Sequence, residues 1–155
     1  MVGVLCHEVG HWHYMHSLKS LLLYLVQNMT LFYVYSFFLN NEGVFKSFGF
    51  KEQSVFVGTA LFYDLHTPLI AVFQYLSQAI KRRFEFASDA FAVRLGYGPQ
   101  LRSSLIKLYR DTAPKIRPDP MYAVINYTHP TLYERIEQID KLMVEGQRAR
   151  EEWLG

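Results

Sequence analysis

The feature that most limits the fold is a long apolar segment without a charged side chain. Residues 20–41 contain no Asp, Glu, Lys or Arg, and residues 21–39 read LLLYLVQNMTLFYVYSFFL. A helix of about 20 apolar residues crosses a bilayer core of about 30 Å and satisfies its own backbone hydrogen bonds. We therefore predict a transmembrane helix at residues 18–40.

A second apolar segment covers residues 54–80. It contains one formally charged side chain, Asp64, and His66 and Pro68 near its middle indicate a broken span. Residues 41–53 are rich in Asn, Gly and mixed charges and are interpreted as a loop, so the two spans form a hairpin. The alternative is a pair of buried core helices, but a chain of 155 residues is short for a soluble core that buries both.

Composition agrees with contact to the lipid bilayer and argues against other partners. Half of the residues are hydrophobic, 16% are aromatic, and the formal net charge is only +2. This charge gives no phosphate-binding surface, so no nucleic-acid partner is expected. The single cysteine, Cys6, excludes an internal disulfide framework and is interpreted as a small buried residue.

The remaining segments have helical patterns, so the predicted fold class is all-α: a membrane-embedded portion with two transmembrane helices and a helical catalytic domain. Residues 1–17 form the first helix, and residues 81–146 form the helical remainder. Within the remainder we expect helices at residues 81–95, 101–109 and 130–144, a proline-rich connection at 113–120, and then a solvated tail at 147–155.

The first predicted helix carries HEVGH, which places His7, Glu8 and His11 within one turn. Histidines four residues apart lie about 40° apart on one helix face, so both imidazoles can reach one ion. Zinc accepts neutral imidazole nitrogen in a tetrahedral site, and Glu8 lies toward the open position, where it can serve as general base. The alternative is a histidine pair on an ordinary helix.

A hydrolytic zinc site needs a third protein ligand, and RRFEFASDAFA supplies a candidate. Glu85 and Asp89 are four residues apart on one helix face. We expect Glu85 to coordinate one zinc ion per chain and Asp89 to accept the second ring N–H of a ligating histidine. The alternative for Glu85 is a surface carboxylate paired with Arg82 or Arg83.

Two further histidines, His13 and His16, follow closely. On a continuous helix they lie about 200° and a net 140° around from His11, so both are interpreted as bystanders.

The segment NYTHPTLYER places His129 before Pro130 at a predicted helix start, with Arg135 six residues after His129. His129 can donate to the oxyanion that forms when water attacks a peptide carbonyl, and Arg135 can bind a carboxylate or hold a local acid. The alternatives are a capping histidine and an exposed arginine paired with Glu134 or Asp140.

In these motifs and their order the chain resembles the integral-membrane gluzincins, and among them the C-terminal catalytic half of the type I CAAX prenyl proteases. The matching segments are HEVGHW, FEFASDAFA, LGYG, LIKL and THPTLYERI. Ala87 and Ser88, where Gln-Ala is expected, and Asn126 depart from the family pattern. The resemblance implies zinc on His7, His11 and Glu85, Asp89 behind the ligands, Glu8 as base and acid, and His129 and Arg135 near the substrate.

The resemblance also implies an activity and a location. The expected enzyme is a zinc metalloendopeptidase that removes the C-terminal aaX tripeptide from prenylated CaaX proteins. Its expected place is the membrane of the endoplasmic reticulum, with the inner nuclear membrane, and its expected partners are a prenylated substrate and a missing N-terminal half of the same enzyme. A membrane quality-control zinc protease and a truncated, inactive membrane fragment are the alternatives.

Membrane topology is the first testable prediction. The flanks of the hairpin carry Lys19, Lys81, Arg82 and Arg83, whereas the connecting loop carries Lys46 and Lys51. Because Lys and Arg concentrate in short cytoplasmic flanks, the HEVGH segment should face the cytosol or nucleoplasm. A glycosylation tag in residues 41–53 should be modified in cells, and a tag after residue 147 should not. Modification of the second tag alone would reverse the topology.

Overall fold

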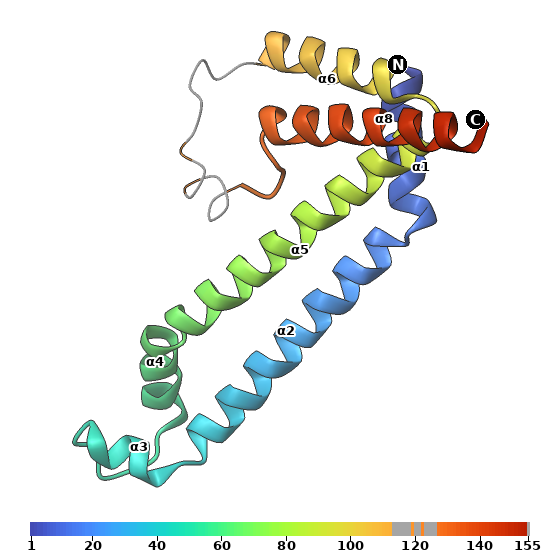
Figure 1. The fold of residues 1–155 in the computed structure, drawn as a ribbon. Coiled ribbons are helices and arrows are strands. Elements are labelled where there is room, and N and C mark those ends of the chain that lie inside the picture. The colour runs from blue at the N-terminus through green and yellow to red at the C-terminus, as the bar shows by residue number, and fades with distance from the viewer. Residues whose placement is uncertain (113–118, 120–121, 123–126, 155) are drawn as a thin grey trace. The chain divides into compact units, whose positions relative to one another are not determined.

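The computed structural model describes residues 1–112, 119, 122 and 127–154, and these residues form helices and no strand. The all-α fold class is thereby confirmed (Figure 1). Most of the expected connection at 113–120 and Asn126 lie outside the described residues. The helices are α1 (Val2–His13), α2 (His16–Leu39), α3 (Glu42–Ser47), α4 (Val55–Leu65), α5 (Thr67–Arg94), α6 (Gly98–Thr112) and α8 (Leu132–Leu154).

The chain divides into two compact units, and one of them, Lys19–Ser77, carries the apolar segments. Helix α2 is long and apolar enough to cross a membrane, and its 24 residues correspond to about 36 Å. Helices α4 and α5 pass the same test only as a pair, bent by 48° at the break between them. The described residues thus contain one candidate membrane span, or two if the bent pair α4 and α5 is taken as a single span. The bend lies within the segment 54–80, where a broken span was expected.

The apolar side chains of α2 are largely exposed to the surroundings. None of the apolar window of this helix is buried inside the protein. Large exposed apolar surfaces mark contact with lipid or another protein, so this surface fits a bilayer. The apolar side chains of α2 that are each more than 40% exposed include Leu21, Leu22, Tyr24, Leu25, Val26, Met29, Phe32, Tyr33 and Phe37.

The expected loop at residues 41–53 contains a short helix, α3. The Asn41 side chain accepts hydrogen bonds from the backbone N–H groups of Gly43 and Val44 at 3.0 and 3.3 Å, which caps the helix. Phe45 of α3 is buried, and a side chain at Gly58 of α4 would meet Phe45 and Leu39. The small residue therefore lets the hairpin close.

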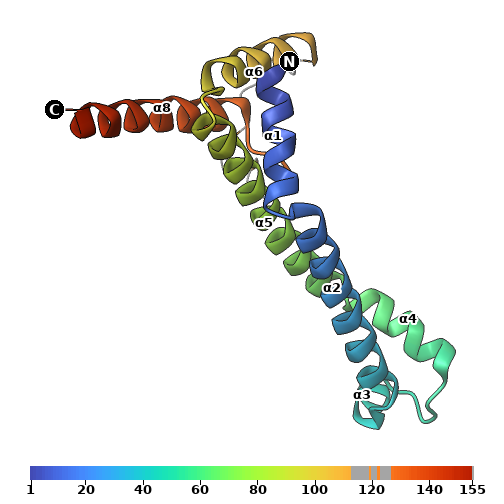
Figure 2. The same ribbon diagram turned by 90° about the vertical axis from the view of Figure 1, so that its right-hand side faces the viewer.

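The other unit comprises Met1–Leu18 and Gln78–Gly155 and contains the predicted metal ligands. Helix α1 packs on α6, and α6 packs on α8 (Figure 2). The core of this unit contains Ala92, Leu101, Leu105 and Ile139, with Cys6, Val93, Leu132 and Met143 packed around it. The interpretation of Cys6 as a packing residue agrees with this position.

Three helix boundaries differ from the sequence expectations. Helix α1 ends at His13, and Met15 adopts a left-handed backbone with φ of 54° before α2 begins. The second apolar segment and the segment that carries Glu85 form one continuous helix, α5. Helix α8 runs through the expected tail, because residues 147–154 are mostly good helix formers and no proline interrupts them.

The close approach of α1 to α6 yields a stability prediction. A Cβ atom at Gly3 would lie 2.3 Å from the backbone nitrogen of Leu101, whereas one at Gly146 would meet nothing within 4 Å. Gly3→Ala should therefore separate the two helices and lower the free energy of unfolding by about 1–3 kcal/mol. Gly146→Ala, the control, should be neutral or slightly stabilising. Thermal unfolding in detergent measures both, and equal melting temperatures would contradict this packing.

Candidate metal centre

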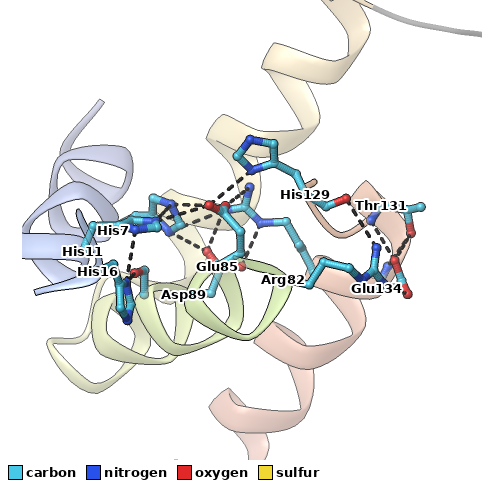
Figure 3. Close-up of polar contacts among 11 residues, drawn as sticks. His7, His11, His16, Arg82, Glu85, Asp89, His129, Thr131 and Glu134 are labelled. Carbon is cyan, nitrogen blue, oxygen red and sulfur yellow. Dashed lines mark hydrogen bonds and ion pairs between the residues drawn. The ribbon is translucent and has the colours of Figure 1, made fainter. Parts of the chain in front are cut away.

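Helices α1 and α5 bring together the three predicted metal ligands. The Nε2 atoms of His7 and His11 lie 3.1 Å apart, and the Glu85 carboxylate lies 3.6 Å from the first and 3.4 Å from the second. One ligand atom from each residue falls within 4.8 Å of the others (Figure 3). His7 and Glu85 are buried, and His11 is partly buried. The three side chains therefore form a group that can hold a metal ion.

The spacing of these ligand atoms suits zinc. Zinc binds imidazole nitrogen and carboxylate oxygen at about 2.0–2.2 Å in a tetrahedral arrangement, so its ligand atoms stand about 3.3–3.6 Å apart. The 3.1 Å between the two nitrogens, the 3.6 Å from His7 to Oε2 of Glu85 and the 3.4 Å from His11 to its Oε1 are close to this range. Two nitrogens and one carboxylate also leave a fourth position open, as hydrolytic zinc sites require.

Asp89 lies behind the ligands, as the sequence predicts. Its Oδ1 accepts a hydrogen bond from Nδ1 of His7 at 2.8 Å, and its side chain has no exposed surface. The proton of His7 is thereby held on Nδ1, and the Nε2 lone pair is left for the ion. The bond fixes both the tautomer and the ring orientation of this ligand.

Arg135 is largely buried beside the site and contacts the carboxylates of Asp89 and Glu85. Its Nε and one terminal nitrogen donate to the two oxygens of Asp89 at 2.8 and 2.7 Å, and the other terminal nitrogen lies 3.4 Å from Glu85. Burial alone would lower the pKa of Arg135, but the hydrogen bonds and charge of Asp89 outweigh burial and raise this pKa. The geometry thus favours a guanidinium that braces a local acid over an exposed one paired with Glu134 or Asp140.

His129 contacts the site, and Glu8 lies on the helix that carries the two histidines. Nδ1 of His129 lies 3.2 Å from Glu85, although the side chain is 68% exposed (Figure 3). Glu8 is exposed on α1. Burial and the nearby His7 lower the pKa of His11, and the negative charges of Glu85 and Glu8 oppose this shift. A lowered pKa keeps the imidazole neutral, which is the form that binds a metal.

The sequence did not predict an ion pair that fixes the start of α8. Arg82 is buried and donates to the Glu134 carboxylate at 2.6 Å and to the His129 carbonyl at 3.4 Å. Glu134 also accepts from the backbone and hydroxyl of Thr131 at 2.7 and 2.8 Å, a capping box (Figure 3). Thr131 rather than His129 therefore caps α8, which begins two residues after Pro130.

This ion pair also excludes one alternative raised by the sequence. Arg82 is engaged with Glu134 and is not the partner of Glu85 that the alternative reading required. The signal for the capping box was present in the sequence, because a Thr followed three residues later by Glu is typical of it. No sequence pattern indicated that Arg82 on α5 would pair with Glu134.

His16 is not one of the three candidate ligands, as expected, but its ring contacts His11 rather than lying around the helix from it. His16 is only 4% exposed, and its Nδ1 lies 3.1 Å from Nδ1 of His11 (Figure 3). The helical-wheel angle did not apply, because the left-handed residue Met15 interrupts the helix between the two histidines. His13, in contrast, is exposed and stacks on Phe91 at 5.0 Å, away from the ligands.

Comparisons with known proteins match the site and its helices. The sequence model of peptidase family M48 matches residues 1–143. The CAAX prenyl protease 1 homolog of Oryza sativa subsp. japonica is 35% identical over 140 residues, covering 90% of this chain and 33% of that protein. The Dictyostelium discoideum homolog is 38% identical over 144 residues, covering 91% and 33%. CAAX prenyl protease 1 of Saccharomyces cerevisiae is 31% identical over 155 residues, covering 90% and 34%.

A solved structure shares the fold. The crystal structure of S. mikatae Ste24p matches with a TM-score of 0.76 and 30% sequence identity, over 90% of this chain and 36% of that one. The chain thus spans about a third of the length of the curated relatives it matches.

The Arg82–Glu134 pair yields a prediction for stability. Glu134→Ala removes the helix cap and leaves the buried guanidinium of Arg82 without its anion. A buried pair broken on one side loses about 3–5 kcal/mol, and partial exposure of Glu134 reduces this to about 2–4 kcal/mol. Glu137→Ala, an exposed change on the same helix, should stay within about 0.5 kcal/mol. Denaturant unfolding in detergent measures both variants, and similar midpoints would argue against the brace.

Proposed function

Because the chain belongs to peptidase family M48, we propose that its metal centre binds one zinc ion per chain and hydrolyses peptide bonds. The observation that carries the proposal is the convergence of His7, His11 and Glu85. Bound zinc supplies Lewis-acid polarisation of the reacting oxygens.

The residues around the centre suit the proton transfers of hydrolysis. Glu8 takes a proton from the attacking water and returns it to the leaving amine, since it is an exposed carboxylate one residue from a ligand. His129 donates a hydrogen bond to the carbonyl oxygen of the substrate as negative charge develops there. Arg135 keeps Asp89 and Glu85 in place, which supports its role as a positioning residue rather than a substrate ligand.

We further propose that the substrate is a prenylated CaaX protein or peptide and that the reaction removes its C-terminal aaX tripeptide. Similarity to CAAX prenyl protease 1 over 90% of this chain supports this assignment. The proposed location is the membrane of the endoplasmic reticulum, with the inner nuclear membrane. The segments that the longer relatives possess outside the matched third would complete the substrate groove, so they are the proposed partner.

The test compares a farnesylated CaaX peptide with its unprenylated twin, using the purified protein in detergent with zinc. Release of the tripeptide from the farnesylated peptide alone would support the proposal. Equal cleavage of both peptides would favour a membrane quality-control protease. Zinc binding with no cleavage of either peptide, even when the N-terminal segments of a longer relative are supplied, would favour an inactive membrane fragment.

Glu8→Gln separates metal binding from proton transfer. The amide cannot accept the proton of the attacking water, so hydrolysis should be lost while zinc content remains near one ion per chain. His11→Ala should lose both hydrolysis and zinc. Metal analysis and peptide cleavage, measured on the same preparations, check the pair. Retained turnover in Glu8→Gln would remove the general-base role from this residue.

His129→Ala tests the oxyanion contact. If His129 donates to the developing charge, kcat should fall by roughly 10²–10³, as loss of one such donor does, with zinc content unchanged. His13→Ala is the matched control, because His13 is also an exposed histidine of the same unit but lies away from the ligands. An unchanged kcat for His129→Ala would leave this histidine without a catalytic role.

A further inference from the structure

One buried side chain contacts a metal ligand and has no role in the reaction described so far. Nδ1 of His16 lies 3.1 Å from Nδ1 of His11, on the side of that ring that faces away from the ligand cluster. The His16 ring stacks on Phe84 of α5 with centroids 4.2 Å apart and an angle of 11° between the planes. The hydroxyl of Ser88 lies 3.4 Å from the same Nδ1. The ring is therefore fixed in position by α5.

The positions of the protons follow from the ligand geometry. Nε2 of His11 faces Nε2 of His7 and the Glu85 carboxylate, so its lone pair points to the ion site. A neutral imidazole that offers Nε2 to a metal carries its proton on Nδ1. At 3.1 Å this N–H must donate to Nδ1 of His16, which then carries its own proton on Nε2.

We propose that His16 is a positioning residue for the metal centre: it accepts the Nδ1–H of His11 and so fixes the tautomer and orientation of that ligand. The inference rests on the proposed function only in taking zinc as the ion. His16 is then the counterpart of Asp89, which accepts the equivalent Nδ1–H of His7 at 2.8 Å. Each histidine ligand has its own acceptor, supplied or held by helix α5.

The two acceptors differ in charge, and this difference has a physical reason. A carboxylate behind His7 is tolerable because Arg135 neutralises it through two hydrogen bonds. A second carboxylate behind His11 would add another buried negative charge, which needs a cation of its own to offset the cost of burial. A neutral imidazole accepts the bond without that cost.

The backbone shows how a residue five positions after His11 comes to lie against it. Met15 adopts φ of 54°, so α1 stops at His13 and the chain turns before α2 begins at His16. On an unbroken helix the two rings would be separated by a net rotation of about 140°. The turn thus makes the contact possible.

The experiment compares three variants of the purified protein by chelator competition for zinc. His16→Phe keeps an aromatic ring for stacking on Phe84 but removes the acceptor, and His13→Phe is the matched control. His16→Gln restores an acceptor oxygen. We expect His16→Phe to weaken zinc binding by about 10–100-fold, as loss of such a partner typically does, with His13→Phe unchanged and His16→Gln closer to the wild type.

Two further readouts separate positioning from folding and from catalysis. The visible spectrum of the cobalt-loaded protein should change in His16→Phe, while the melting temperature of the metal-free protein should not. Wild-type zinc affinity in His16→Phe, or an equal loss in His13→Phe or His16→Gln, would overturn the proposal. None of these readouts depends on peptide cleavage. If the variants show the expected zinc affinities but the protein cleaves no peptide, the proposed function is rejected and the role of His16 is not.

Discussion

The helices of the metal centre are held together by one buried carboxylate. Asp89 on α5 accepts from His7 on α1 at 2.8 Å and from Arg135 on α8 at 2.7 and 2.8 Å. Its side chain has no exposed surface, and a buried charge without partners costs several kcal/mol. Helix α1 or α8 can therefore leave α5 only by stranding that charge, which makes the positions of the ligands depend on this contact.

The charges around Asp89 also prepare the site for a cation. With both ligating histidines neutral, Glu85 and Asp89 contribute two negative charges and Arg135 one positive charge, so these three groups sum to one net negative charge. A divalent ion turns this sum positive. A positive centre within a partly buried site attracts the negative charge that develops on a carbonyl oxygen under attack. Arg135 thus stabilises the metal-free centre and also adds to the positive charge of the centre once an ion is bound.

Local spacing predicted much of this arrangement, and non-local contacts account for what it missed. The apolar segments and the four-residue spacings in HEVGH and in the Glu85 segment report directly on helix faces, so the helices and the residues that share a face followed from periodicity. The choice of Glu85 as third ligand followed instead from the need of a zinc site for a third protein ligand and from the family resemblance. The contact of His16 with His11 was missed because Met15 and its neighbours carry no glycine or proline that would signal the end of α1. The pairing of Arg82 with Glu134 joins residues 52 apart, and no periodic pattern encodes such a partner.

The sequence separation of the contacts to Asp89 has a consequence for biogenesis. His7 lies 82 residues before Asp89 along the chain, and Arg135 lies 46 residues after it. Contacts that close long loops form late, after local helices, and synthesis proceeds from the N-terminus. During translation the apolar hairpin is made before Glu85 on α5 and before Arg135 on α8. An ion held by all three candidate ligands can therefore be bound only after the hairpin has been synthesised, since Glu85 follows it in the chain.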